Sequence, residues 1–227
     1  MAPAPPPGRI PTPARLAATL GGRLPVAGQR IGLLGGSFNP AHAGHRHVSL
    51  EALRRLGLDA VWWLVSPQNP LKPVAGMAPF AQRLAEARAV ARHPRLRVTG
   101  LEALLDTRYT ADTLTALTRR FRGVRFVWLM GADNLIQVSR WEAWTQIFHV
   151  VPVAVLARPT YSLRASSAKA AQRFRRRRLS ETRAASLAAQ QPPAWALLHI
   201  RLSALSATQI RAARRRSAGS PTNEATE

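Results

Sequence analysis

The sequence has no cysteine, and only two of its 33 basic residues are lysines. Without cysteine the chain can form neither disulfides nor thiolate metal sites, which suits a reducing cytoplasm. No apolar run reaches the roughly 18 residues that a membrane-spanning helix requires. Prolines interrupt the N-terminus, so the apolar stretch of a signal peptide is missing too. We therefore expect a cytoplasmic protein that makes no use of a membrane.

Acidic residues are few as well, and the 11 that are present leave a net charge of +22. Residues 151–216 carry 14 Lys or Arg and a single acid, Glu181. Such an excess attracts polyanions, either nucleic acid or free nucleotides. The arginines of residues 173–178, with Phe174 among them, are the best case for RNA binding. In a helix, however, they would surround the whole circumference, and the preference for arginine over lysine is typical of a biased composition. Nucleic-acid binding is therefore the less favoured interpretation.

The length and composition indicate one domain with flexible ends. Residues 1–28 contain seven of the 18 prolines and few large apolar side chains, so we expect a disordered leader that adds no element to the core. Residues 29–216 form the expected domain. Residues 217–227 read Ser-Ala-Gly-Ser-Pro-Thr-Asn-Glu-Ala-Thr-Glu, which predicts a flexible polar tail.

Strand-like and helix-like patterns alternate along this domain. Continuous apolar runs predict strands at residues 30–34, 61–65, 96–99, 125–130, 150–157 and 195–200. Between them, apolar residues at helical spacing predict a helix that ends at a Gly57 C-cap, a helix over residues 78–92, and one over residues 109–121 with Thr110 as N-cap. Short helices follow as far as Phe148, and longer ones are expected at residues 167–190 and 206–216. This alternation predicts an α/β fold, a Rossmann-like parallel sheet with helices on both faces, whose ligands bind beyond the carboxyl ends of the strands.

A glycine turn joins the first expected strand to the first expected helix. Residues 31–45 read Ile-Gly-Leu-Leu-Gly-Gly-Ser-Phe-Asn-Pro-Ala-His-Ala-Gly-His. Glycines let the backbone approach an anion closely, and a helix start offers backbone N–H groups to a phosphate. The imidazoles of His42 and His45 add two donors beside them, while His47 is expected on the surface. The adjacent glycines fit neither Gly-x-Gly-x-x-Gly nor a P-loop, so the segment predicts a nucleotide-phosphate site of another kind.

This segment resembles the hallmark of the nucleotidyltransferase superfamily that carries a His-x-Gly-His motif. The second hallmark of the superfamily, Ser-x-Thr-x-x-Arg, is matched by Ser206, Thr208 and Arg211, which would offer hydroxyls and a bidentate cation to phosphate oxygens. Within the superfamily the chain is most similar to the bacterial nicotinate-nucleotide adenylyltransferases. Four further segments carry that similarity: Asn-Pro-Leu-Lys-Pro at residues 69–73, Arg-Tyr-Thr-Ala-Asp-Thr-Leu at 108–114, Met-Gly-Ala-Asp-Asn-Leu at 130–135 with Trp141, and Arg158 with Pro159.

The chain departs from the pattern of that family in three places. Asn39 stands where the family mostly has Asp, and Thr160 stands where Gly is common. The apolar C-terminal helix of many members has no counterpart in the sequence after Arg216. This last departure leaves the oligomeric state open.

The resemblance implies a reaction, the transfer of the adenylyl group of ATP to nicotinate mononucleotide, which gives deamido-NAD (nicotinate adenine dinucleotide) and pyrophosphate. A phosphate monoester is a competent nucleophile at neutral pH. The enzyme therefore has to align two polyanions and stabilise the leaving pyrophosphate rather than supply a base. His42, His45 and Arg211 would be the catalytic residues, and no core contact is expected for the His45 imidazole. Mg²⁺ would arrive with ATP, because the scattered acids form no protein metal site.

The resemblance also implies two sets of binding residues. ATP would contact Gly35, Gly36, Ser37, Phe38, His42, Gly44, His45, Gly131, Asp133, Ser206, Thr208 and Arg211. Nicotinate mononucleotide would contact Asn39, Lys72, Tyr109, Thr110, Trp141 and Arg158. Asp133 would accept hydrogen bonds from ribose or adenine, unless it caps a helix. Trp141 would stack on the pyridine ring, unless it belongs to the core as we expect of Trp144.

Two alternatives stay open at this point. A related enzyme of the superfamily would transfer a nucleotidyl group to another phosphomonoester, such as nicotinamide mononucleotide or pantetheine phosphate. The segments at residues 109–114 and 131–141 favour the nicotinate substrate over pantetheine phosphate, and how strictly the acid is preferred over the amide stays open. A basic RNA-binding protein is the alternative from another class, and it would have no need of His42.

Overall fold

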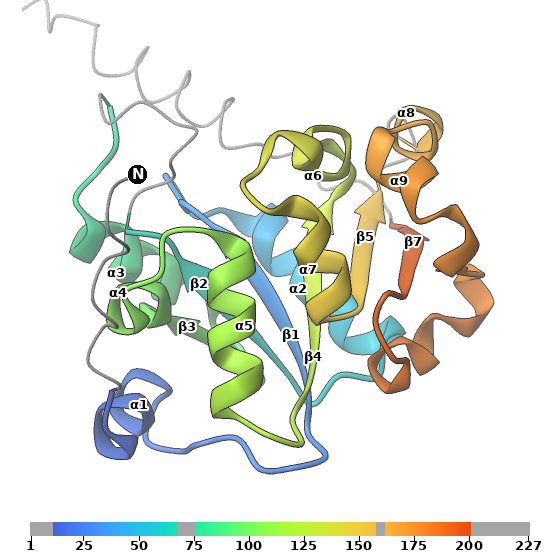
Figure 1. Cartoon of the computed structure of the whole chain (residues 1–227). Coiled ribbons are helices and arrows are strands. Elements are labelled where there is room, and N and C mark those ends of the chain that lie inside the picture. Colours follow the sequence, from blue (N-terminus) through green and yellow to red (C-terminus); the bar gives the residue numbers. More distant parts are fainter. Residues whose placement is uncertain (1–10, 68–75, 158–161, 201–227) are drawn as a thin grey trace, which may run out of the picture.

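The computed structural model describes residues 11–67, 76–157 and 162–200, so the helix predicted at residues 206–216 lies outside the described residues. Seven strands form one sheet in the order β3-β2-β1-β4-β5-β7-β6, and every neighbouring pair is parallel. The strands are β1 (Arg30–Gly36), β2 (Ala60–Val65), β3 (Leu96–Thr99), β4 (Arg125–Gly131), β5 (Val153–Ala157), β6 (Arg178–Leu179) and β7 (Trp195–His199). Figure 1 shows the arrangement. The predicted α/β fold with a parallel sheet is confirmed.

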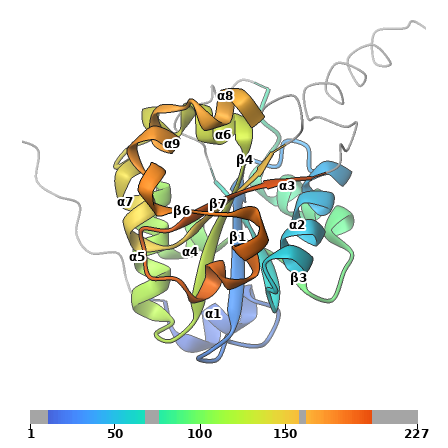
Figure 2. The same cartoon turned by 90° about the vertical axis from the view of Figure 1, so that its right-hand side faces the viewer.

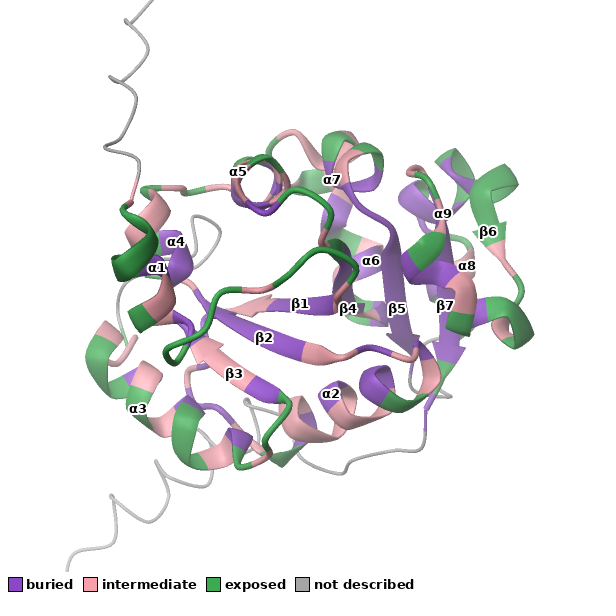
Figure 3. Cartoon of the chain, turned by 90° about the horizontal axis from the view of Figure 1, so that it is seen from below, coloured by how far each residue is buried: buried purple, intermediate pink, exposed green. Residues whose placement is uncertain are grey.

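Helices cover both faces of the sheet (Figure 3). One face carries α1 (Pro13–Thr19), α4 (Leu101–Leu105), α5 (Thr110–Arg120), α6 (Ala132–Gln137), α7 (Trp144–Val150), α8 (Ser162–Ser166) and α9 (Lys169–Arg173). The other face carries α2 (Ala43–Arg55), α3 (Phe80–Ala91) and the 3₁₀ helix η4 (Glu181–Ala189), and the view of Figure 2 shows α2 and α3 side by side. Among the described residues, no helix is long and apolar enough to cross a membrane.

Alternation along the strands divides the interior into two cores. Trp62 faces the core under α5 and α7, whereas its neighbours Val61 and Trp63 face the core under α2 and α3. Successive side chains of a strand point to opposite faces, so a strand buried on both sides needs apolar residues at every position. This requirement explains the uninterrupted apolar runs from which the strands were predicted.

Most predicted elements are confirmed, but two boundaries are wrong. The strand expected at residues 150–157 begins only at Val153, because Val150 still belongs to α7. The helix of residues 109–121 begins at Thr110, and Tyr109 rather than Thr110 occupies the N-cap position. The N-cap was predicted wrongly because no side chain caps this helix. The N-cap residue, Tyr109, is therefore not one of the residue types by which an N-cap is recognised in a sequence.

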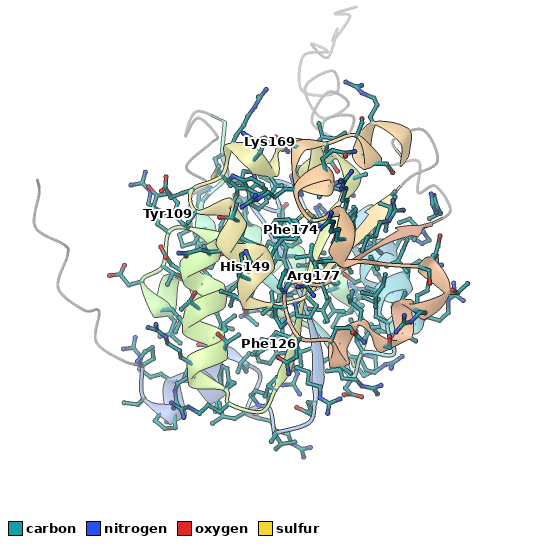
Figure 4. The ribbon with its side chains drawn as sticks, turned by 45° about the vertical axis from the view of Figure 1, so that its right-hand side comes forward. Tyr109, Phe126, His149, Lys169, Phe174 and Arg177 are labelled. Carbon is teal, nitrogen blue, oxygen red and sulfur yellow. The ribbon has the colours of Figure 1, made fainter. Side chains whose placement is uncertain are left out.

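The long helix expected at residues 167–190 is wrong. The chain there forms α9, the 3₁₀ helix η3 (Arg175–Arg177), the edge strand β6 and η4. Phe174 breaks the helix: its ring stacks on Phe148 at 4.4 Å between centroids, and its carbonyl accepts a hydrogen bond from Trp195 Nε1 at 2.9 Å. Phe174 is 6% exposed, whereas Arg177 is exposed, and Figure 4 labels both residues. The arginines of residues 173–178 therefore lie at the end of α9, on η3 and on β6, and they do not surround one long helix.

The expectation that residues 1–28 add nothing to the core is wrong for α1. Leu16 and Leu20 are 0% and 1% exposed and belong to the core that α4 and α5 cover. Thr12 caps the helix by accepting a hydrogen bond from the Arg15 N–H at 3.4 Å, and a proline occupies its first turn. Proline is favoured at a helix start, so Pro13, one of the prolines that suggested disorder, marks the N-terminus of α1.

One buried acid is left without a hydrogen-bond or ion-pair partner among the described residues. Glu102 in the first turn of α4 is 9% exposed, and burial raises the pKa of its carboxyl to about 7. The folded protein thus binds this proton more tightly than the unfolded chain does. Glu102 accordingly lowers the free energy of unfolding as the pH rises from about 4.5 to about 7 and changes it no further above that.

We expect Glu102→Gln to remove this pH dependence. Relative to the wild type, the variant should gain up to roughly 3 kcal/mol of stability at pH ~8, and much less at pH ~4.5, where the carboxyl of the wild type keeps its proton when folded. Denaturant unfolding at the two pH values measures the difference. The exposed Glu142→Gln is the matched control. An equal shift of both variants at both pH values would contradict the assignment.

We expect Leu16→Ala to destabilise the fold by about 2–5 kcal/mol, because it leaves a cavity in a core that would not exist if the leader were disordered. Leu24→Ala, at a position that is 37% exposed, should cost less than about 1 kcal/mol. Thermal or urea unfolding compares the two variants. Equal destabilisation by the two substitutions would contradict the assignment of α1 to the core.

Candidate functional site

The order of the strands places a topological switch point at the carboxyl ends of β1 and β4. The chain moves from β1 to β2 and β3 on one side and from β4 to β5 on the other, while β1 and β4 pair directly. In open α/β sheets, ligands bind at such a switch point, outside the carboxyl ends of the strands. The glycine turn follows β1 and Asp133 follows β4, so the sheet brings these two predicted parts of the ATP site together.

Side-chain packing and the backbone conformation of Phe38 both determine the shape of the glycine turn. Gly35 and Gly36 are the last residues of β1, and Ser37 and Phe38 after them are buried. A Cβ at Gly35 would lie 2.3 Å from Trp128 Cη2, so only glycine lets the indole of β4 lie against β1. Phe38 has a positive φ of 47°, which turns the chain from the strand toward the start of α2. Gly35 therefore has a structural role, and its contact with ATP stays a prediction.

His42 and His45 cap the N-terminus of α2. The Gly44 N–H donates to His42 Nδ1 at 3.1 Å, and the His42 N–H donates to His45 Nδ1 at 3.3 Å. These reciprocal bonds form a capping box made of two imidazoles, whose ring centroids are 3.9 Å apart. A nitrogen that accepts an N–H carries no proton itself. In both neutral imidazoles the proton is therefore on Nε2, which makes Nε2–H the hydrogen-bond donor.

Aromatic packing fixes the orientation of the His45 ring. Its centroid lies 4.8 Å from that of Phe38 and 5.9 Å from that of Trp63, and these two rings stack on each other at 5.0 Å. Trp63 Nε1 donates to Ser49 Oγ at 2.7 Å, and Ser49 Oγ donates to the His45 carbonyl at 2.8 Å. The expectation that His45 makes no core contact is wrong, because the imidazole forms part of the wall of the core under α2.

Asn39 ties the turn to the segment before α3. Its Nδ2 donates to the Gly76 carbonyl at 3.1 Å, and its Oδ1 accepts from the Ala78 N–H at 3.3 Å. An aspartate at this position could accept the second bond but could not donate the first. The amide thus has a structural reason in this chain, and its contact with nicotinate mononucleotide stays a prediction.

Asp133 lies over the end of β4. It is exposed in the first turn of α6, and a Cβ at Gly131 would lie 2.4 Å from its Oδ1. The neighbours Met130 and Leu129 face the cores under α5 and α2, respectively, so the alternation assigns the Cβ direction of Gly131 to the side of α2. The carboxylate is therefore on the same side of the sheet as His42 and His45. The alternative role as a helix cap is wrong, because Gly131 is the N-cap of α6 and no side chain caps it.

The residues expected to bind the nicotinate part lie around α5 and α6. Tyr109 and Thr110 are half-buried at the start of α5, where Figure 4 shows Tyr109, and the Arg108 guanidinium lies 5.9 Å from the Tyr109 ring centroid. Trp141 follows the 3₁₀ helix η1 (Val138–Arg140) and is half-buried at the edge of the core. Trp144 packs edge-on against Phe148 and Phe174 at this same core. The predicted residues Lys72, Arg158, Ser206, Thr208 and Arg211 lie outside the described residues.

The sequence analysis missed Arg83, which is 1% exposed beside the glycine turn. The signal was present in the sequence, because Arg83 stands between Phe80 and Ala87 on the stripe of α3 that faces the core. A charged residue on an apolar stripe indicates a buried charge with dedicated hydrogen-bond partners.

Comparison with known proteins relates the chain to nucleotidyltransferases. Residues 33–213 match the cytidylyltransferase-like family. A probable nicotinate-nucleotide adenylyltransferase of Cereibacter sphaeroides is 58% identical over 182 residues, which cover 80% of this chain and 96% of that protein. One of Parvibaculum lavamentivorans is 57% identical over 188 residues, which cover 83% and 94%.

A solved structure is similar in fold. The Plasmodium falciparum nicotinic acid mononucleotide adenylyltransferase complexed with NaAD matches with a TM-score of 0.60 and 15% identity, over 81% of this chain and 83% of that one. At that identity the likeness concerns the fold alone, and it agrees with the parallel sheet described above.

The capping box predicts the proton positions of both histidines. In ¹⁵N-histidine-labelled protein at neutral pH, two-bond ¹H–¹⁵N spectra should show Nδ1 unprotonated and Nε2 protonated for His42 and His45. The exposed His149, for which no hydrogen bond is found among the described residues, should show the tautomer mixture of a solvated imidazole. A proton on Nδ1 of either capping histidine would contradict the geometry.

Proposed function

The chain belongs to the family of nicotinate-nucleotide adenylyltransferases, and we propose that it transfers the adenylyl group of ATP to nicotinate mononucleotide. The products are deamido-NAD and pyrophosphate, and the reaction is a step of NAD biosynthesis. The observation that carries the proposal is the pair of Nε2–H donors that His42 and His45 hold at the start of α2, at the switch point of the sheet. We place the reaction in the cytoplasm, where ATP is available.

The chemistry requires alignment and charge stabilisation. A phosphate oxygen of nicotinate mononucleotide attacks the α-phosphorus of ATP and forms a P–O bond. The bond from that phosphorus to the oxygen bridging to the β-phosphate breaks, and pyrophosphate leaves with the electron pair. The attacking phosphate is already an anion, so no group on the protein has to remove a proton. Donors that meet the charge as it develops on the phosphate oxygens supply the catalysis.

The described residues can provide these donors. The Nε2–H groups of His42 and His45 donate to the α- and β-phosphates, and the N-terminal end of the 13-residue helix α2 adds its positive field. The carboxylate of Asp133, on the same side of the sheet, accepts hydrogen bonds from the ribose or adenine of ATP. In this proposal Ser206, Thr208 and Arg211 hold the β- and γ-phosphates, and Lys72 and Arg158 hold the mononucleotide phosphate.

Mg²⁺ enters the proposal as part of the ATP substrate. In the part of the chain that the structure describes, no group of three or more His, Asp or Glu side chains could hold an ion. The Nδ1 atoms of His42 and His45 already accept backbone N–H groups, which removes them as ligands. A cation held by phosphates and water would add to the neutralisation of the triphosphate.

The start of α5 suggests how the acid is chosen over the amide. Backbone N–H groups at Tyr109 and Thr110 would donate to the nicotinate carboxylate, with Trp141 stacked on the pyridine ring. The amide of nicotinamide mononucleotide would place its own N–H₂ donors against those N–H groups. A site built on hydrogen-bond donors rejects such a ligand strongly, because buried polar groups are left unpaired.

We expect pyrophosphate release from ATP and Mg²⁺ to depend on nicotinate mononucleotide. Nicotinamide mononucleotide and phosphopantetheine, offered separately, should support much slower release. A preference for either would assign the pocket to another branch of the superfamily. The absence of release with all three would contradict the proposal, and a salt titration of RNA binding would then test the basic surface.

The two nitrogens of His45 can be tested separately. His45→Asn keeps an acceptor near the Nδ1 position and so preserves the capping bond, but it has no donor at the Nε2 position. We expect kcat to fall by about 10²–10³-fold with the fold intact. His45→Gln places its amide N–H₂ near Nε2 and should retain more activity, although it loses the cap. His149→Asn is the control, and wild-type kcat in His45→Asn would refute the donor role.

A further inference from the structure

Arg83 is a buried cation whose partners are all backbone carbonyls. Its Nε donates to the Ala78 carbonyl at 2.9 Å, and its Nη1 donates to Ser37 at 2.6 Å and Ser66 at 2.8 Å. Its Nη2 donates to Pro67 at 2.6 Å. In the described part of the chain no carboxylate pairs with it. Burial lowers the pKa of the guanidinium. The dipoles of the four carbonyl groups stabilise its positive charge in place of a carboxylate.

The four carbonyls come from three segments that meet only in the folded protein. Ser37 begins the glycine turn after β1, Ser66 and Pro67 follow the end of β2, and Ala78 precedes α3. Asn39 contacts the third segment as well, through Gly76 and Ala78. Figure 3 shows α3, which carries Arg83, next to α2 on the same face of the sheet. One side chain thus fixes the distance between the turn that begins the phosphate site and the chain that leaves β2.

This arrangement needs the shape of arginine as well as its charge. A guanidinium presents five N–H donors in a rigid planar fork, and four of its hydrogen bonds are made here along separate directions. A lysine ammonium has three donors on one atom and cannot reach three segments at once. The Phe80 ring, whose centroid lies 5.6 Å from the Arg83 Cζ, supports the plane of the fork from the same helix.

We propose that Arg83 is a positioning residue of the reaction, which holds the loops after β1 and β2 in register so that the two substrates are aligned. The inference rests on the proposed function, in which the first loop leads to His42 and His45 and the second leads toward Lys72. Transfer between two bound anions depends on their alignment, and a displacement of about 1 Å can cost about 100-fold in rate. The charge of Arg83, which no carboxylate of the described residues neutralises, also favours the binding of polyanions at the turn.

Two substitutions of Arg83 separate the effect of the guanidinium geometry from the effect of its positive charge. Arg83→Lys keeps a cation but loses the bridging of three segments. Its kcat should fall by about 100-fold, while its KM for ATP should stay within about threefold of the wild type. Arg83→Met loses the charge too, so its KM for ATP should rise by about tenfold in addition. Arg88→Lys and Arg88→Met, at an exposed position of the same helix, should leave both constants unchanged.

Hydrogen–deuterium exchange gives a measure that does not depend on activity. In folded Arg83→Lys, residues 37–41, 66–67 and 76–79 should exchange faster together, while β1, β2 and β4 keep their protection. If the wild type is inactive in the pyrophosphate assay, the proposed function fails, and exchange alone still decides whether Arg83 joins the loops. Wild-type kcat in Arg83→Lys, faster exchange over the whole sheet, or failure of this variant to fold would each overturn the proposal.

Discussion

Two hydrogen bonds at the start of α2, from the His42 N–H to His45 Nδ1 and from the Gly44 N–H to His42 Nδ1, are the constraint on which the geometry of the site depends. A helix leaves its first N–H groups without partners inside the helix, and these groups need acceptors. Two imidazoles meet that need through Nδ1 at the start of α2, and the same bonds direct the remaining proton of each ring to Nε2. The capping that stabilises the helix therefore also sets the donors that the proposed reaction would use. In the proposed reaction, stability depends on Nδ1 and catalysis on Nε2 of the same two rings.

Acidic residues are scarce, and two of them, Asp59 and Glu181, are held by arginine and histidine partners in the described part of the chain. Asp59 accepts from the side chain and backbone of Arg30, and these bonds hold the pKa of its carboxyl below the usual range. Burial raises the pKa of Glu181, but hydrogen bonds from His199 and Arg55 outweigh this effect and leave that pKa lowered. Asp59 joins the first residue of β1 to the segment before β2, and Glu181 joins the end of α2 to the end of β7. Neither of them pairs with Arg83, whose hydrogen bonds among the described residues all go to backbone carbonyls.

The strands and the phosphate turn could be predicted because their signals are local. Five of the apolar runs became strands within a residue or two of the expected bounds, since a strand buried on both faces leaves little choice of residue type. The exceptions have equally physical causes. Pro13 of the expected leader marks the start of α1. The helical pattern after residue 167 is interrupted at Phe174, whose ring stacks on Phe148 and whose carbonyl accepts a hydrogen bond from Trp195. Local composition favoured disorder in one case and a helix in the other, and contacts with distant residues reversed both.

The sequence by itself determined the class of fold and the family and predicted the residues offered to the phosphates, because these depend on periodicity and on short motifs, each of which is local in the chain. The tertiary structure alone decided which nitrogen of each histidine carries the proton, on which side of the sheet Asp133 lies, and what Arg83 holds together. Arg83 and Ser37 are 46 residues apart and meet only after β1, β2 and α3 have packed. The sequence shows which hydrogen-bond donors and acceptors are present. Which of them pair across such separations is decided by the packing of the helices against the sheet.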